Sequence, residues 1–149
     1  MSFVNNIKDI MGNKDEPAKP AAASVTSSSK KVLIVEDEDM LASALELKLK
    51  HEGLEVVKAA NGQLGLEMAL SFKPDIILMD LLMPVMDGKT MLHELRKLPE
   101  YKNIPVIVLT NAGNVDNMKE TQVYENANEF LVKSNVSLEE VVSKVKSLI

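Results

Sequence analysis

The chain of 149 residues contains no cysteine and no tryptophan, and aromatic residues make up only 3% of it. Without cysteine it has no disulfide framework, no thiol nucleophile and no thiolate metal site, as is usual in a reducing compartment. No apolar run approaches the roughly 18 residues of a membrane span, and residues 1–30 lack the uninterrupted apolar core of a secretory signal. We therefore expect a cytoplasmic protein without a membrane span.

Basic residues are also few: 17 lysines and arginines stand against 22 acids, which gives a net charge of −5. Residues 1–31 contain five lysines and only three acids, so the excess of negative charge falls on residues 32–149. Proteins that bind nucleic acids draw most of their affinity from lysine and arginine side chains that neutralise phosphates. The composition therefore predicts no direct contact with nucleic acid.

The first 31 residues differ in composition from the rest of the chain. Residues 13–31 are rich in proline, alanine and serine and have too few large apolar groups to offset the entropy of ordering, which predicts a flexible linker. Residues 1–12 form a short amphipathic segment that is marginal as an isolated helix. It is either a frayed terminus or a peptide that docks weakly on a protein or on a membrane surface. Its apolar residues fall at helical spacing: Phe3, Val4, Ile7, Ile10 and Met11.

From residue 32 onward, aliphatic runs of strand length alternate with segments of helical periodicity. The predicted strands are Val32–Val35, Leu54–Ala59, Asp75–Met79, Pro105–Leu109 and Glu129–Val132. The predicted helices are Asp39–His51, Gln63–Phe72, Gly88–Leu98, a weaker one at about Val115–Tyr124, and Leu138–Ile149. We expect Leu47 on the apolar face of the first helix, and Leu64 and Leu70 on that of the second.

This alternation predicts an α/β fold, a flavodoxin-like (βα)5 doubly wound parallel sheet. Right-handed crossovers place helices on both faces of such a sheet, which explains why its strands are continuous aliphatic runs. In the strand order 2-1-3-4-5 the chain reverses direction between strands one and three, and a crevice opens at their carboxyl ends.

Acids follow both strands that border this crevice. Asp80 ends the third strand, and Glu36 and Asp37 end the first. Carboxylates a few ångströms apart repel by roughly 4 kcal/mol per pair at an effective dielectric of about 20, and hard oxygen ligands suit Mg²⁺. We predict a magnesium ion held by Asp37, Asp80 and the main-chain oxygen of Leu82, with Glu36 acting through a water molecule. Taken singly, such acids are more often helix caps or turn residues, as Asp39 and Asp87 could also be.

A hydroxyl and an ammonium complete the predicted site, because strand four ends in Thr110 and strand five ends in Lys133. Transfer of a phosphoryl group needs in-line positioning and neutralisation of charge on three equatorial oxygens, with little covalent work from the protein. Asp80 would be the nucleophile, and Lys133 and Thr110 would contact the phosphoryl oxygens.

Four separated motifs resemble the receiver domain of two-component response regulators over residues 32–149, and the chemotaxis-type stand-alone receivers in particular. They are Val32–Glu38, Ile76–Asp80 with Met83–Gly88, Val108–Thr110 and Phe130–Lys133.

The resemblance implies that Asp80 accepts phosphate from a histidine kinase or phosphotransfer protein, and that Thr110 and Phe130 form a conformational switch. It implies a phosphoacceptor and no enzyme beyond its own phosphorylation and dephosphorylation. Because the chain ends with the last helix at Ile149, we expect a single-domain regulator that acts on an effector protein through residues 115–149.

Four residues around the motifs depart from the family or affect its chemistry. Ser134 replaces the usual proline after the lysine, which leaves the geometry of that loop open, and Asn111 is larger than the usual alanine or glycine. Leu82 and Ala112 are apolar and cannot orient a hydrolytic water, so we predict slow dephosphorylation.

Three other functions are compatible with parts of this pattern. A haloacid-dehalogenase-type phosphatase needs a second acid where Leu82 stands. The acids after the first strand would repel a flavin phosphate. A receiver-like adaptor that binds proteins independently of phosphorylation stays open as the alternative.

Overall fold

The computed structural model describes residues 29–114 and 126–149. Within them, five parallel strands form one sheet in the order β3-β2-β4-β5-β6. The predicted order 2-1-3-4-5 is therefore confirmed. The strands are β2 Lys31–Val35, β3 Glu55–Ala59, β4 Ile76–Met79, β5 Val106–Thr110 and β6 Glu129–Val132.

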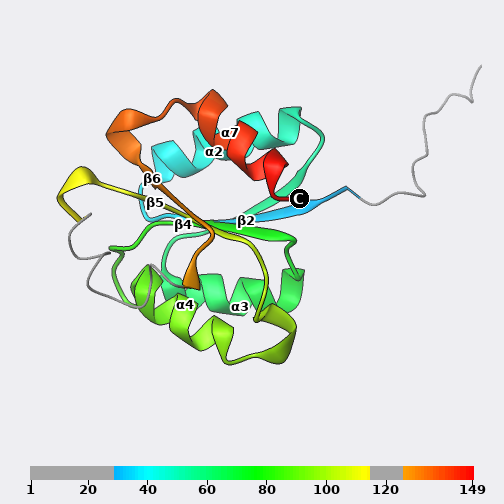
Figure 1. Cartoon of the computed structure of the whole chain (residues 1–149), viewed down its shortest axis with the longest axis vertical. Coiled ribbons are helices and arrows are strands. Elements are labelled where there is room, and N and C mark those ends of the chain that lie inside the picture. The colour runs from blue at the N-terminus through cyan, green and yellow to red at the C-terminus, as the bar shows by residue number, and fades with distance from the viewer. Residues whose placement is uncertain (1–28, 115–125) are drawn as a thin grey trace, which may run out of the picture.

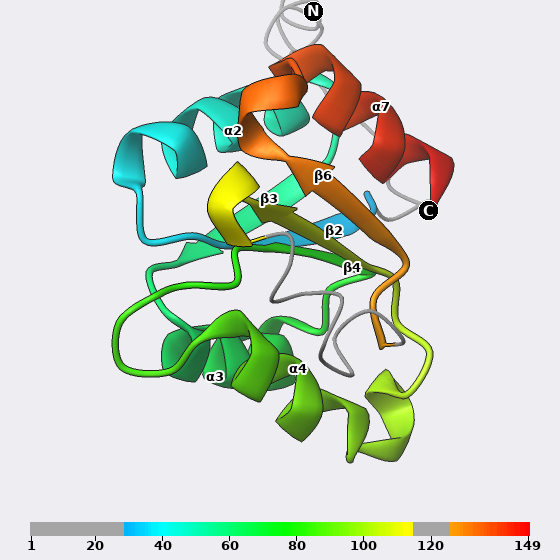
Figure 2. The same ribbon diagram turned by 60° about the vertical axis from the view of Figure 1, so that its left-hand side comes forward.

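Helices cover both faces of the sheet. They are α2 Asp39–His51, α3 Gly62–Phe72, α4 Gly88–Arg96 and α7 Leu138–Ser147, with 3₁₀ turns η2 Pro99–Tyr101, η3 Ala112–Asn114 and η4 Lys133–Asn135. Figures 1 and 2 show α2 and α7 on one face and α3 and α4 on the other. None of the helices in the described ranges combines the length and apolar character that a membrane crossing requires.

Three predicted elements cannot be compared with the structure. The weaker helix at 115–124, the amphipathic segment 1–12 and most of the linker 13–31 lie outside the described residues.

The central strands alternate between two cores. Leu33 and Val35 of β2 pack toward α3 and α4, whereas Val32 and Ile34 pack toward α2 and α7. All four are buried, because β2 lies inside the sheet and has a helical layer on each side. This double burial fixes the register of the central strands and hence the position of the residues that follow them.

Three leucines predicted on apolar helix faces are instead exposed. Leu47 of α2 is 73% exposed, and Leu64 and Leu70 of α3 are 44% and 48% exposed. In α2 the buried face passes through Leu45 and Leu49, one turn apart, and Leu47 lies about 200° around the axis from Leu45. The prediction for Leu47 was therefore wrong, because residue type alone does not show which side of the helix faces the sheet. Two helices are also shorter than predicted, since α4 ends at Arg96 and α7 at Ser147.

Arg96 connects the end of α4 to the segments that lead into β5 and β6. Its guanidinium donates hydrogen bonds to the carbonyl oxygens of Tyr101 (2.7 Å), Ile104 (2.9 Å) and Asn126 (2.6 Å). Burial lowers the pKa of Arg96 from its ordinary value. These bonds satisfy three carbonyls that precede β5 and β6 and help to hold these two strands in register.

Candidate functional site

Two backbone hydrogen bonds place the key carboxylates at the carboxyl edge of the sheet. The Glu36 N–H donates to the Ala59 carbonyl, and the Asp80 N–H donates to the Val35 carbonyl, each at 3.0 Å. The strand pairing therefore extends one residue beyond β2 and β4. Glu36 and Asp80 are only 4% and 3% exposed. The sheet thus fixes the backbone positions of Glu36 and Asp80 at the crevice between strands one and three, as expected.

The acids predicted to bind a metal do come together. One carboxylate oxygen each from Glu36, Asp37 and Asp80 lies within 4.8 Å of the other two. Glu36 and Asp80 are buried and Asp37 is exposed, so the cluster is open to solvent on one side. Three crowded hard oxygen donors with an open side fit Mg²⁺, which usually keeps several waters and takes one or two carboxylates. Leu82 is 56% exposed, and the role of its main-chain oxygen stays a prediction.

Lys133 lies between the acids from the opposite side of the crevice. Its ammonium is 3.0 Å from Glu36 Oε1, 3.1 Å from Asp80 Oδ2 and 3.5 Å from Glu38 Oε1. Burial lowers the pKa of Lys133, but hydrogen bonds to Glu36 and Asp80 outweigh this, so the pKa lies above its ordinary value. The side chain is therefore a fixed cation at the predicted nucleophile.

Burial also shifts the pKa of Glu36. Loss of solvent raises this pKa, and repulsion from the neighbouring Asp80 raises it further, whereas hydrogen bonds from Lys133 and from the Glu38 N–H lower it. The net direction is upward, which means that the folded protein holds the Glu36 charge at a cost.

The loop after β4 closes tightly on Asp80. The Leu81 N–H donates to Asp80 Oδ1 at 2.7 Å, and the Gly88 N–H donates to the Leu81 carbonyl at 2.8 Å. A Cβ at Gly88 would lie 2.1 Å from the Asp80 carbonyl oxygen, so only glycine fits there. The orientation of the Asp80 carboxylate is thereby fixed from both sides, by Lys133 and by the loop backbone.

Thr110 ends β5 and is fully buried, and its hydroxyl is the one buried side-chain polar atom of the described residues that has no hydrogen-bond partner. Such a group costs about 1–3 kcal/mol, which is usually explained by a ligand, water or functional role. Phe130 lies on the adjacent strand, paired with Val108, and packs partly buried against the core on the α3–α4 side. The two predicted switch residues therefore lie on neighbouring strands.

Other predicted residues have simpler roles. Asp87 accepts from the Thr90 N–H at 2.8 Å and caps α4, and Asp39 lies 3.7 Å from Lys58, so neither joins the cluster. The described residues contain no cis peptide bond, which makes the Lys133–Ser134 bond trans. Asn111 is exposed.

Sequence reasoning missed two participants. Glu38 contacts Lys133, and its N–H donates to Glu36 Oε2 at 3.1 Å. The acidic run 36–39 was the available signal for Glu38. The Leu81 N–H, which binds the Asp80 carboxylate, carries no signal in the sequence.

Comparison with known proteins bears on this arrangement directly. A family model described as the response regulator receiver domain matches residues 32–146. The chain belongs to the response regulator receiver domain family. It is similar to the transcriptional regulatory protein SrrA of Staphylococcus aureus, with 38% identity over 121 residues, 81% of this chain and 48% of that protein. The receiver chain thus spans about half the length of the curated relatives it matches.

Solved structures of receivers superpose on this one. The chemotaxis response regulator CheY4 of Vibrio cholerae is 28% identical, with a TM-score of 0.73 over 82% of this chain and 100% of that one. The receiver domain of the sensor histidine kinase PA1611 from Pseudomonas aeruginosa is 26% identical, with a TM-score of 0.72 over 81% and 98% of the two chains. That structure holds a magnesium ion coordinated in its active site cleft.

Proposed function

We propose that this receiver accepts a phosphoryl group on Asp80 from the phosphohistidine of a histidine kinase or phosphotransfer protein. The observation that carries the proposal is the environment of one buried carboxylate. Asp80 is held by the Leu81 N–H and by the Lys133 ammonium, within 4.8 Å of two further acids.

In the proposed reaction an Asp80 oxygen forms a bond to phosphorus as the bond from phosphorus to the donor imidazole nitrogen breaks. The imidazole keeps the electron pair and takes up a proton. Lys133 stays next to Asp80 and neutralises charge on the transferred group, and the unpartnered Thr110 hydroxyl gains an acceptor. Glu36, Asp37, Asp80 and the main-chain oxygen of Leu82 would hold Mg²⁺, which supplies charge neutralisation for a phosphoryl oxygen.

Phosphorylation then shifts the population between two states of the domain. A Thr110 hydroxyl drawn toward the phosphoryl group leaves space on the β5–β6 side, into which Phe130 turns. The surface that includes β6 and α7 changes with it, which supports residues 115–149 as the contact for an effector protein. In this proposal the domain is a cytoplasmic signalling switch and catalyses only its own phosphorylation and dephosphorylation.

The test is incubation of the full chain with acetyl phosphate and Mg²⁺, followed by intact mass measurement. We expect a Mg²⁺-dependent gain of one phosphoryl group in the wild type and none in Asp80→Asn. The matched control is Asp75→Asn, an exposed acid at the other end of β4 that binds the Lys31 N–H. An adduct that persists in Asp80→Asn would refute the proposal. Absence of any adduct in the wild type would favour the adaptor that binds partners without phosphorylation.

A further inference from the structure

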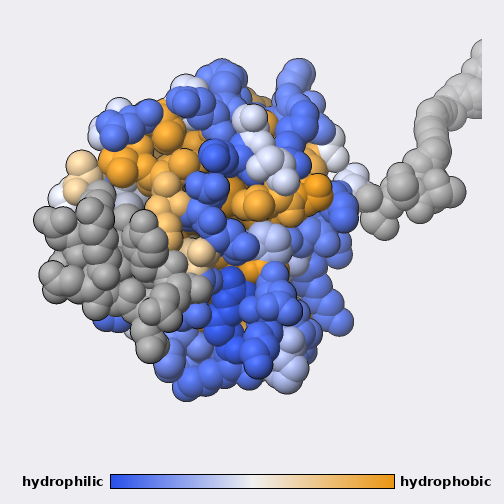
Figure 3. Space-filling model, viewed as in Figure 1, coloured by the Kyte–Doolittle hydropathy of each residue, from blue (hydrophilic) through white to orange (hydrophobic). Residues whose placement is uncertain are grey.

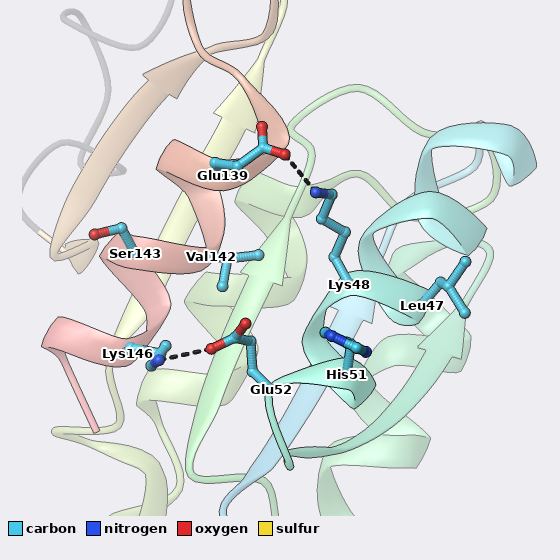
Figure 4. Close-up of a pocket in the computed structure, with 8 residues that line it drawn as sticks. All are labelled: Leu47, Lys48, His51, Glu52, Glu139, Val142, Ser143 and Lys146. Atoms are coloured by element: carbon cyan, nitrogen blue, oxygen red, sulfur yellow. Dashed lines mark hydrogen bonds and ion pairs between the residues drawn. The ribbon is translucent and has the colours of Figure 1, made fainter.

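A groove of about 640 Å³ lies between α2 and α7 on their solvent-facing side (Figure 4). Leu47 and Lys48 line it from α2, and Val142 and Ser143 line it from α7. Most of the surface that lines the groove is apolar. The short side chains of Val142 and Ser143 face long ones on α2, which leaves the space between the helices open.

Ion pairs close the groove at both ends. Lys48 pairs with Glu139 at one end, and Lys146 pairs with Glu52 at 2.7 Å at the other. In Figure 4 the Val142 side chain points from α7 toward α2 between these two pairs. The pairs are largely solvent-exposed, and such pairs contribute little to stability, so they can rearrange at low cost around an incoming apolar side chain.

The groove is separate from the acidic site, and none of its lining residues belongs to the phosphoacceptor cluster. Figure 3 shows hydrophobic residues gathered over the part of the molecule that carries α7 and the C-terminus, whereas the side of α3 and α4 is mainly hydrophilic. Leu47 is 73% exposed at the groove and gains burial if the groove is filled.

The chain itself offers an occupant, because its N-terminal part leaves the domain next to the groove. The Lys30 carbonyl accepts from the Glu55 N–H at 2.9 Å, three residues after the groove residue Glu52. Figure 1 shows the start of β2 and the C-terminal end of α7 at the same end of the sheet. A flexible chain as long as residues 13–29 has a root-mean-square span of about 20–25 Å, and the stretch of α7 that lines the groove is about 10 Å long.

The remaining 12 residues have the pattern that such a groove accepts. Phe3, Ile7 and Ile10 follow the spacing i, i+4, i+7 and would share one face of a helix. So short a helix is marginal alone and gains its stability from the surface on which it packs. We propose that residues 3–11 bind in the α2–α7 groove of their own chain as an amphipathic helix, with this apolar face on Leu47 and Val142. The segment thereby covers the α2–α7 face and competes with any partner that uses it.

The absence of cysteine allows a direct test on the full chain. A nitroxide spin label is attached to Asn5→Cys, and broadening of backbone amide signals is measured by NMR in ¹⁵N-labelled protein. We expect the amides of residues 47–52 and 139–146 to lose most of their intensity, while those of α3 and α4 keep theirs. Leu47→Glu should restore the lost intensity. Its matched control, Leu70→Glu on α3, replaces another exposed leucine outside the groove and should restore nothing.

Three results would overturn the inference. The first is that no broadening occurs away from Lys30, and the second is that the broadening is centred on another surface. The third is that broadening appears when spin-labelled protein without ¹⁵N is mixed with ¹⁵N-labelled protein that lacks the cysteine. The last result would mean that the segment binds a second copy. The inference does not depend on phosphorylation of Asp80, and the experiment contains no phosphodonor, so either proposal can fail without the other.

Discussion

Replacement of Glu36 by glutamine should stabilise the metal-free protein at neutral pH. At an effective dielectric of about 20, the Lys133 ammonium at 3.0 Å attracts the Glu36 carboxylate by about 5.5 kcal/mol. Asp80 has an oxygen within 4.8 Å and repels that carboxylate by about 3.5 kcal/mol, whereas the equally near Asp37 is exposed and its repulsion is weakened by solvent. Burial is the largest cause of the raised Glu36 pKa, and together with these repulsions it exceeds the attraction to Lys133, which keeps Asp80 as its partner. We expect Glu36→Gln to raise the free energy of unfolding by about 1–2 kcal/mol.

The dependence on pH follows from the raised pKa of Glu36. Because the folded state holds the Glu36 proton more tightly than the unfolded state, this residue makes the wild type less stable as the pH rises through its folded pKa. The advantage of Glu36→Gln is therefore largest above that pKa and disappears toward the ordinary glutamate value of about 4.3. Added Mg²⁺ should reverse the order of stability, since the wild type retains all three carboxylates for the ion.

The assay is urea unfolding followed by far-ultraviolet circular dichroism, since the chain has no tryptophan. Curves are recorded from pH 5 to 8 with chelator and with Mg²⁺. The matched control is Glu55→Gln, an exposed glutamate at the start of β3, which should change stability by less than about 0.5 kcal/mol. A metal-free Glu36→Gln protein that is less stable than the wild type at pH 7, or whose advantage grows on acidification, would refute the electrostatic reasoning.

Three further predictions concern the residues around Asp80. Thr110→Val removes an unpartnered buried hydroxyl and should raise the free energy of unfolding by about 1 kcal/mol while slowing the acetyl phosphate reaction; a clear loss of stability would show that the hydroxyl is satisfied. Gly88→Ala should lower the free energy of unfolding in urea by about 3 kcal/mol, because its Cβ would clash with the Asp80 carbonyl. The control Gly113→Ala has open space around its Cβ and should leave this free energy unchanged, and equal effects of the two variants would contradict the prediction. Leu82 and Ala112 cannot orient a water, so the phosphorylated protein should decay slowly, and a labelled-phosphate lifetime of only seconds would be incompatible with that prediction.

The positions of the strands and of the main acids could be predicted from the sequence because both depend on local pattern. A strand buried on two faces is a continuous aliphatic run, and the residue that ends it must lie at the sheet edge. Asp80 and Glu36 each follow such a run, and Lys133 follows the half-buried edge strand β6. The structure brings both carboxylates within 3.1 Å of Lys133 Nζ.

The features that the sequence did not reveal depend on packing in three dimensions. Leu47 was misplaced because the phase of α2 is set by which residues contact the sheet, and leucine alone does not report it. Neither the 2.1 Å clearance at Gly88 nor the unsatisfied Thr110 hydroxyl follows from residue type. In the loop between Asp80 and Gly88, Val85 has φ of +70°, a conformation that a β-branched residue rarely adopts and that no local rule would assign to it.

The central claim is that the acyl phosphate forms on Asp80, and borohydride trapping tests it most directly. The receiver is treated with acetyl phosphate and Mg²⁺, reduced with sodium borohydride and mapped by peptide mass spectrometry, with samples lacking the phosphodonor or Mg²⁺ as controls. The account predicts conversion of the residue at position 80 to homoserine only when both phosphodonor and Mg²⁺ are present. Reduction at Asp37 or another acid, with an intact Asp80, would contradict it.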